Sequence, residues 1–370
     1  MKRLPALDGI RGLAALFVVL NHVFLRAFPG YPVDHAPVWA AGFIYGRFAV
    51  VVFIVLSGFS LSLAVARDGW RLGDLRRYAR RRAWRILPAY WAALAFSLAM
   101  TWWVLAQPGW PVPDERSVLV NGLLVQDVFS AASPNRAFWS IAIEAQLYLL
   151  LPLLVLAARR FGAATALAAV AVPVLALGVA AGDGARTPAH LIDQYTPDLA
   201  VLFAIGVAAA GVAATAAAGR RPWHWYAAAL AAPVVALIVR RGSVWTIGHF
   251  FWVDLALGPA LGCLLVAVST QCGLMLDRVL GARPLRRLGE FSYSLYLTHG
   301  PIVIAVYYGL VQHHVRPGVP TFVLLCAAVV PLTVLFARAF AEIFELPFQR
   351  RRGREAISVA LHRAVPRDAR

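Results

Sequence analysis

Long apolar stretches recur along the whole chain and constrain its fold more than any other feature. We place ten of them, at about residues 8–27, 43–66, 86–106, 138–158, 161–181, 197–218, 223–239, 246–271, 291–311 and 319–341. Each approaches the roughly 20 residues that a helix needs to cross a bilayer. Hydrophobic residues make up 61% of the chain, more than a soluble domain holds. The sequence therefore predicts an all-α polytopic membrane bundle of about ten transmembrane helices.

Positive charge is distributed unevenly between the connecting segments. The formal net charge is +17, and Lys2 is the single lysine. With the N-terminus inside, 25 of the 35 lysines and arginines fall on the cytoplasmic side. This bias predicts that both termini face the cytoplasm, and that anionic lipids rather than nucleic acid are the partners of the basic segments. Arg240 and Arg241 fall on the opposite side and mark where a miscounted helix would lie.

The remaining features indicate one domain. We expect residues 1–350 to form a single transmembrane domain and residues 351–370 a short basic cytoplasmic tail, with no soluble domain at either end. The N-terminus resembles a signal peptide, but Arg11 and His22 interrupt it and a clean cleavage site is missing, so it is interpreted as a retained helix. The cysteines lack metal-ligand spacing, and no metal site is expected.

Two ionisable residues share one face of the first predicted helix. Arg11 and His22 are eleven residues apart, which is about three turns or roughly 16 Å along the axis. Asp8, one turn before Arg11, can pair with it. Ionisable groups inside a span are costly and indicate function by default. The alternative is that Arg11 extends to the interface and His22 bonds a neighbouring helix.

A carboxylate lies inside the fourth predicted span. FWSIAIEAQLYLLLP places Glu144 at about the same depth below the outer boundary as His22. The two side chains could form a base and the group that orients it. Alternatively, arginine or tryptophan neighbours simply satisfy the carboxylate.

Two arginines stand one turn apart at the cytoplasmic start of the third predicted span. RRYARRRAWRILPAYW contains Arg82 and Arg85, and guanidinium groups suit phosphates. A positive-inside anchor explains them equally well.

Other polar residues in the spans are less informative. Ser57 lies among small residues in VVFIVLSGFSLS, which favour close helix packing, with a serine nucleophile as the weaker alternative. His299 lies at mid-depth, where it lines a pocket or bonds another helix. Asp198, Asp254 and Arg338 are also within spans, but the sequence assigns them no role.

Taken together, these segments resemble the membrane acyltransferase-3 family, O-acyltransferases that modify bacterial surface polysaccharides, macrolides and related acceptors. The matching segments, in chain order, are LDGIRGLAALFVVLNH, VFIVLSGFSL, RRAWRILPAYW, FWSIAIEAQLYLLLP, GEFSYSLYLTHGP and FELPFQRR. They extend from residue 7 to about residue 350 and include Tyr148, Tyr293, Tyr296 and Glu345.

The resemblance implies an acyl-CoA donor taken from the cytoplasm, a catalytic histidine matching His22 and an essential arginine matching Arg11. Ala145 stands where the family often has a second acidic residue, which places more weight on Glu144. Some members carry an added extracytoplasmic esterase-like domain, which we do not expect here. The further candidates for the pocket are Asp8, Ser57, Tyr148, Tyr293 and His299.

In the resulting hypothesis, His22 is the general base that takes the proton from the acceptor hydroxyl. Glu144 orients the imidazole, Arg11 holds the donor, and Arg82 and Arg85 guard the cytoplasmic mouth. A two-step route through an acylated His22 fits the same residues.

We therefore predict an O-acyltransferase of the bacterial cytoplasmic membrane. It would move an acyl group, expected to be acetyl, from acyl-CoA to a hydroxyl of a glycan or of a glycosylated or secondary-metabolite acceptor. Acyl-CoA is a co-substrate, and no tightly bound cofactor is expected. The alternative is a transporter or flippase for a glycan or lipid-linked substrate, which the lack of an internal repeat disfavours.

Overall fold

The computed structural model describes residues 4–33, 35–104, 112–182, 192, 195–270 and 275–349, and every regular element in them is helical. The long helices are α1 (Pro5–Ala27), α3 (Arg47–Arg67), α4 (Leu75–Ala99), α6 (Phe138–Phe161), α7 (Ala163–Gly182), α9 (Asp198–Ala213), α10 (Trp223–Gly248), α11 (Phe250–Thr270), α14 (Ser292–Val306) and α15 (Val319–Phe344). The short ones are α2 (Val38–Ala41), α5 (Glu115–Gly122), α12 (Met275–Leu280), α13 (Arg283–Glu290) and the single-turn segments η1 (Gly42–Tyr45), η2 (Met100–Val104), η3 (Ala218–Arg220) and η4 (Tyr307–Val311).

Each of the ten predicted spans coincides with a long helix. Among the described residues, eight helices are long and apolar enough to cross a membrane. The two others are α9, which has 16 residues, and α4, whose first half is rich in arginine. The all-α, multi-pass architecture is thus confirmed, whereas the number ten and the orientation of the termini remain predictions.

The predicted end of the seventh span lies close to a kink in α10. The span was expected to end near residue 239, and the first helical run of α10 ends just before Gly242, after which a second short run leads to Gly248. Gly242 has φ of 76° inside this element, so the chain turns at a kink rather than in an open loop. Glycine tolerates this left-handed conformation because it lacks a Cβ.

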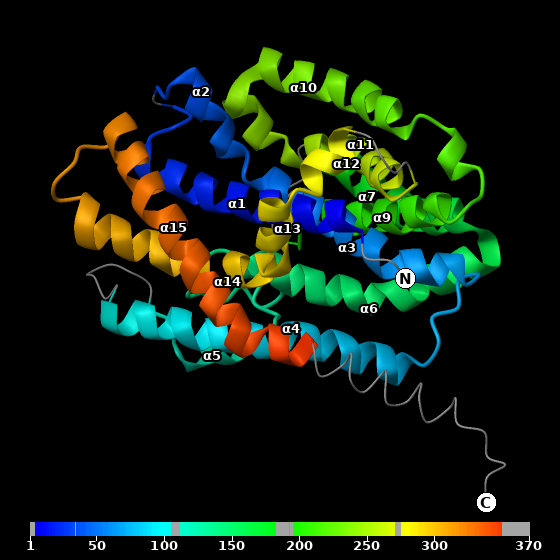
Figure 1. Cartoon of the computed structure of the whole chain (residues 1–370), viewed down its shortest axis with the longest axis horizontal. Helices are drawn as coiled ribbons and strands as arrows, with labels where there is room; N and C mark the ends of the chain where they lie inside the picture. Colours follow the sequence, from blue (N-terminus) through cyan, green and yellow to red (C-terminus); the bar gives the residue numbers. More distant parts are fainter. Residues whose placement is uncertain are drawn as a thin grey trace, which may run out of the picture.

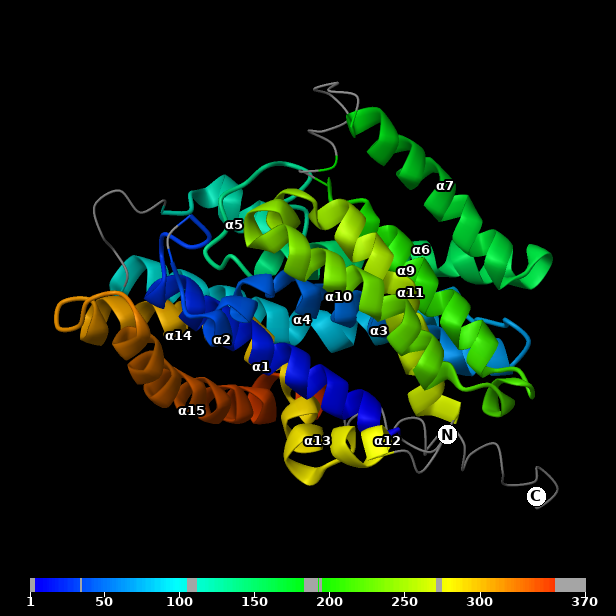
Figure 2. The same cartoon turned by 90° about the horizontal axis from the view of Figure 1, so that it is seen from above.

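The helices differ in how deeply they lie in the bundle. α1 contacts α3, α13, α14 and α15 and runs through the centre of the view in Figure 1. By contrast, only 11% of the apolar window of α7 and of α10 is buried, and Figure 2 shows α7 projecting from the edge of the bundle. The apolar outer faces of these helices would contact lipid. A helix makes its backbone hydrogen bonds internally, so it can face hydrocarbon without leaving polar groups unpaired.

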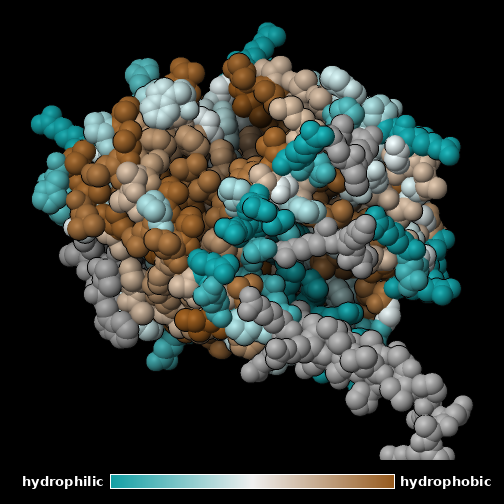
Figure 3. Space-filling model, in the orientation of Figure 1, coloured by the Kyte–Doolittle hydropathy of each residue, from teal (hydrophilic) through white to brown (hydrophobic). Residues whose placement is uncertain are grey.

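Apolar side chains are also exposed on other helices. Leu149, Leu310 and Leu335 are all at least two-thirds exposed, at 77%, 67% and 70%. In Figure 3, hydrophobic side chains cover much of the left half of the face, whereas hydrophilic ones gather near its centre, over its right side and at its left edge. A broad apolar surface of this kind suits a protein whose helices lie in hydrocarbon.

Glycines in the first predicted motif let α1 touch its neighbours backbone to backbone. A Cβ on Gly9 would lie 1.8 Å from the Leu280 carbonyl oxygen, and one on Gly289 would lie 1.8 Å from that of Asp8. Close approach of this kind is typical of helix packing in membranes. It fixes the start of α1, and with it Asp8 and Arg11, against α12 and α13.

A second glycine pair joins α3 to α9. A Cβ on Gly58 would lie 2.2 Å from the Phe203 carbonyl oxygen, and one on Gly206 would lie 2.1 Å from that of Val55. The close packing predicted for the small residues around Ser57 is therefore confirmed.

Candidate active site

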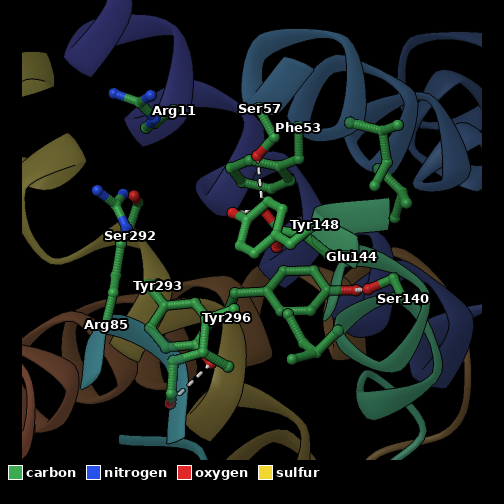
Figure 4. Close-up of a pocket in the computed structure, with 14 residues that line it drawn as sticks. Arg11, Phe53, Ser57, Arg85, Ser140, Glu144, Tyr148, Ser292, Tyr293 and Tyr296 are labelled. Atoms are coloured by element: carbon green, nitrogen blue, oxygen red, sulfur yellow. Dashed lines mark hydrogen bonds between the residues drawn. The ribbon is translucent and has the colours of Figure 1, made fainter. Parts of the chain in front are cut away.

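A cavity of about 70 Å³ lies between α1, α3, α4, α6 and α14, and we call it the Arg11 cavity. Its polar lining residues are Arg11, Ser57, Arg85, Ser140, Glu144, Tyr148, Ser292, Tyr293 and Tyr296. Figure 4 shows the guanidinium groups of Arg11 and Arg85 on one side, with Ser57, Glu144 and Tyr148 facing them. Cations and hydrogen-bonding groups therefore converge on one concave space, as is typical of ligand sites.

Arg11 is held in place by two neighbours. Its guanidinium lies 3.3 Å from Asp8 Oδ1 and donates to Ser60 Oγ at 2.8 Å. The predicted pairing of Asp8 with Arg11 is thus confirmed. Because only part of the guanidinium is used, the remaining N–H groups can meet an anion.

Glu144 is the centre of a small hydrogen-bonded group. Ser57 Oγ donates to Glu144 Oε1 at 2.5 Å, and the Tyr148 hydroxyl donates to the same oxygen at 2.6 Å. Tyr148 is one turn further along α6, so the helix itself presents both side chains to the cavity.

A second cavity, of about 330 Å³, lies beside His22, and we call it the His22 cavity. It is lined by Val18, Asn21, His22, Gly46, Arg47, Val50, Arg136, Ala137, Trp139 and Tyr296. Val50 and Tyr296 line both cavities, and the Tyr296 hydroxyl is 2.6 Å from Ser140 Oγ. Tyr296 therefore stands between the two spaces.

His22 contacts a second histidine. Its Nδ1 lies 2.9 Å from the Val18 carbonyl oxygen and 3.3 Å from His299 Nε2. His299 is fully buried, and its Nδ1 lies 2.7 Å from the Tyr296 carbonyl oxygen. A carbonyl oxygen only accepts, so each Nδ1 carries a proton, and His299 Nε2 can accept from His22.

This tautomer leaves Nε2 of His22 free to accept a proton. With the proton on Nδ1, Nε2 carries a lone pair, and it has no hydrogen-bond partner among the described residues. If Nε2 takes a proton, the ring becomes an imidazolium. The two acceptors beside its Nδ1–H, the Val18 carbonyl oxygen and His299 Nε2, would stabilise that charge. The geometry is that of a general base held by a second group.

The predicted pairing of His22 with Glu144 was wrong. Glu144 lines the Arg11 cavity and bonds Ser57 and Tyr148, whereas His22 lines the other cavity and contacts His299. Residue counting placed both side chains at one depth but gave no information on which way each helix turns. Arg11 and His22 share one helix but line different cavities, which are separated at Tyr296.

Arg82 and Arg85, in the first half of α4, line different spaces. Arg85 lines the Arg11 cavity. Arg82 lies 5.9 Å over the Tyr148 ring and lines a neighbouring apolar groove between α4 and α6. Arg85 is therefore the better placed of the two to contact a ligand beside Arg11.

Sequence reasoning missed an ion triad next to His22. Arg47 donates from Nε to Asp254 at 2.5 Å and from a terminal nitrogen to Asp198 at 2.9 Å. Both aspartates are almost completely buried. The charge distribution counts Arg47 among the outer-side arginines, although two intramembrane carboxylates in one chain already required a cation nearby. Arg338, by contrast, pairs with Glu342 one turn away on an exposed face.

Glu345, in the last of the matching segments, FELPFQRR, holds α14 in position. Glu345, which is 5% exposed, accepts from the backbone N–H of Ser294 at 3.2 Å and from its hydroxyl at 2.5 Å. The first N–H groups of a helix have no partner within it. Glu345 thus caps the helix that carries Tyr293, Tyr296 and His299.

A proline removes one backbone hydrogen bond from the same helix beside His299. Pro301 has no N–H, so it cannot donate to the Leu297 carbonyl one turn earlier. Asn135, which is 4% exposed, donates to that oxygen from Nδ2 at 2.8 Å. Gly300 leaves room for it, since a Cβ there would lie 2.8 Å from Asn135 Oδ1.

We expect Asn135→Ala to lower stability by about 1–3 kcal/mol, because it leaves the buried Leu297 carbonyl without a donor and the Ala137 N–H without an acceptor. Adding Pro301→Ala restores a backbone N–H for the Leu297 carbonyl and should recover that part of the loss, measured as thermal stability in detergent. Tyr78→Phe is the matched control, since Tyr78 donates to the Tyr148 carbonyl that Pro152 leaves free in α6. If Pro301→Ala rescues Tyr78→Phe equally well, the repair is not specific to α14.

Comparisons with known proteins identify the family of the chain. The family model described as an acyltransferase domain matches residues 4–338. The O-acetyltransferase OatA of Staphylococcus aureus is 23% identical over 393 residues, covering 94% of this chain and 57% of OatA. The peptidoglycan O-acetyltransferase OatA of Listeria monocytogenes is 22% identical over 346 residues, covering 82% and 50%.

The chain spans about half the length of the curated relatives it matches. No solved structure matches it. The family model nevertheless extends over nearly the whole described bundle, from α1 into α15, and includes both cavities. The chain belongs to the acyltransferase-3 family.

Proposed function

We propose that this protein is a membrane O-acetyltransferase that takes an acetyl group from acetyl-CoA and transfers it to a hydroxyl of a glycan. The observation that carries the proposal is the placement of an arginine-lined cavity and a histidine-lined cavity on the two sides of Tyr296. The named activity of the relatives supports an acetyl group and a cell-wall glycan such as peptidoglycan.

The donor would enter by the Arg11 cavity. Arg11 and Arg85 offer guanidinium groups to the phosphates of CoA, since such groups bind phosphate through paired N–H donors. In the predicted orientation this end faces the cytoplasm, where acetyl-CoA is found. To bring the thioester to His22, the pantetheine arm must displace Tyr296 from its hydrogen bond to Ser140.

Transfer would then take place at His22. Nε2 removes the acceptor hydroxyl proton while the oxygen attacks the thioester carbonyl, and the C–S bond breaks as the ester forms. The proton passes to the departing sulfur, so the products are the ester and CoA thiol. Val18 and His299 hold Nδ1–H throughout and stabilise the imidazolium.

The test uses the purified protein in nanodiscs with acetyl-CoA and a peptidoglycan glycan fragment. We expect CoA thiol and acetyl ester to form in equal amounts. Ester formation only from another acetyl donor would contradict acetyl-CoA as the donor. Movement of the glycan across a vesicle membrane without ester formation would indicate a transporter.

The proposed role of Arg85 in donor binding can be tested separately. Arg85→Gln should raise the KM for acetyl-CoA by about 10-fold, the loss of one charge-assisted contact. The kcat should change less, because a phosphate contact is made equally in ground and transition states. Arg82→Gln, outside the cavity, is the control and should change KM less. A fall in kcat at constant KM would show that Arg85 does not hold the donor.

A further inference from the structure

The cations around the His22 cavity are not equivalent. Arg47 is fully engaged, because it bonds Asp198 and Asp254 and lies 5.7 Å over the Trp139 ring. Arg136 also lines the cavity and comes from the segment just before α6. It has no hydrogen-bond or ion-pair partner among the described residues, and its side chain is exposed. Its charge is therefore free to meet an incoming group.

The surroundings of Arg136 reinforce its positive field. No carboxylate is among the described residues that line the cavity. A further arginine, Arg26, lies one turn beyond His22 on α1. Within the described part of the chain, the hydrogen bond of Arg26 goes to an uncharged hydroxyl, that of Tyr308. Because Arg47 is compensated by its two aspartates, the unpaired charge of Arg136 is the one that would attract an anionic group into this cavity.

The other polar side chains of the cavity are already used. Asn21 Nδ2 donates to the Phe43 and Ile44 carbonyl oxygens at 2.7 and 3.2 Å. A Cβ on Gly46 would lie 2.3 Å from the Asn21 side chain, so that side chain is tightly enclosed. This leaves His22 Nε2 for the reacting hydroxyl and Arg136 for a second group on the same acceptor.

We propose that the His22 cavity is the acceptor site, and that Arg136 selects a glycan with a carboxylate near the hydroxyl to be acetylated. This inference rests on the proposed function, because it assigns the acceptor class of the same site. A carboxylate matches the guanidinium fork with two parallel hydrogen bonds. A neutral glycan of the same length would lack that contact but would still reach His22.

Two oligosaccharides of equal length provide the test. One is chitopentaose, which is neutral, and the other alternates N-acetylglucosamine with N-acetylmuramic acid, which carries a free carboxylate. Wild type, Arg136→Gln, Arg136→Lys and Arg316→Gln are assayed for kcat/KM with acetyl-CoA. Arg316 is the matched control, an exposed arginine that lies outside the residues lining the cavity.

We expect wild type to prefer the carboxylated acceptor by about 10-fold or more, the value of one hydrogen-bonded charge contact. Arg136→Gln should remove the preference by raising KM for that acceptor alone. Arg136→Lys should retain part of it, and Arg316→Gln all of it. An equal use of both acceptors by wild type, or an unchanged preference in Arg136→Gln, would overturn the proposal.

Two further readouts distinguish acceptor binding from lipid binding and from a failure of the chemistry. If Arg136→Gln lowers activity toward both acceptors equally, and the effect depends on anionic lipid in the nanodisc, Arg136 binds a lipid headgroup and the proposal is wrong. Calorimetric binding of each oligosaccharide without donor tests Arg136 even if no ester forms. Selective binding with no transfer from any donor would reject the proposed function while supporting the acceptor site.

Discussion

His22→Ala is expected to lower acetyl transfer by about 10²–10⁴-fold, the usual contribution of a positioned general base. The variant should still insert and fold, because it adds no charge to the bilayer. Its main structural loss is the contact with His299, an uncharged partner. The measurement is ester formation from acetyl-CoA by protein purified in a single size-exclusion peak.

His299→Gln is the informative companion. Its amide can still lie beside His22 Nδ1, although the ring stacked edge-on to His22 at 4.7 Å is lost. We expect an intermediate loss, seen in kcat rather than in the KM for acetyl-CoA. Activity of His22→Ala within a few-fold of wild type would end the assignment of His22 as the base.

Most of the helical architecture could be predicted from the sequence, because lipid demands long apolar helices. The exceptions were local. A kink at Gly242 interrupts α10 just after Arg240 and Arg241, and a second short helical run follows where the sequence predicted a loop. Hydropathy could not reveal this, because a glycine inside an apolar stretch does not by itself indicate left-handed φ.

The candidate site was predicted less completely. Positions along a helix follow from its rise, so the depths of Arg11 and His22 could be estimated. The rotation of one helix against another depends on packing, such as the glycine contacts of α3 with α9. For this reason the Glu144 contact with Ser57 and the His22 contact with His299, which both join two helices, could not be anticipated.

The triad beside His22 gives the second large expected effect. Arg47→Met should destabilise the protein by about 3–5 kcal/mol, because it leaves two buried carboxyl groups without their cation. Asp198 and Asp254 are 1% and 0% exposed, and one oxygen of each has no partner among the described residues even in the intact triad. The measurement is thermal unfolding in detergent, followed by size-exclusion chromatography.

The combination Arg47→Met, Asp198→Asn and Asp254→Asn separates charge balance from packing. Replacing all members of a buried ion group can be nearly neutral, whereas removing one leaves an uncompensated charge. The triple variant should therefore recover most of the stability lost in Arg47→Met. It keeps His22, His299 and Arg136 unchanged, so it should also retain acetyl transfer and the preference for a carboxylated acceptor.

A triple variant as unstable as Arg47→Met would show that Arg47 acts by packing over Trp139 and Phe250, whose rings lie 5.7 and 5.5 Å from its guanidinium carbon. A stable triple variant that lost transfer would instead place the triad in the catalytic machinery.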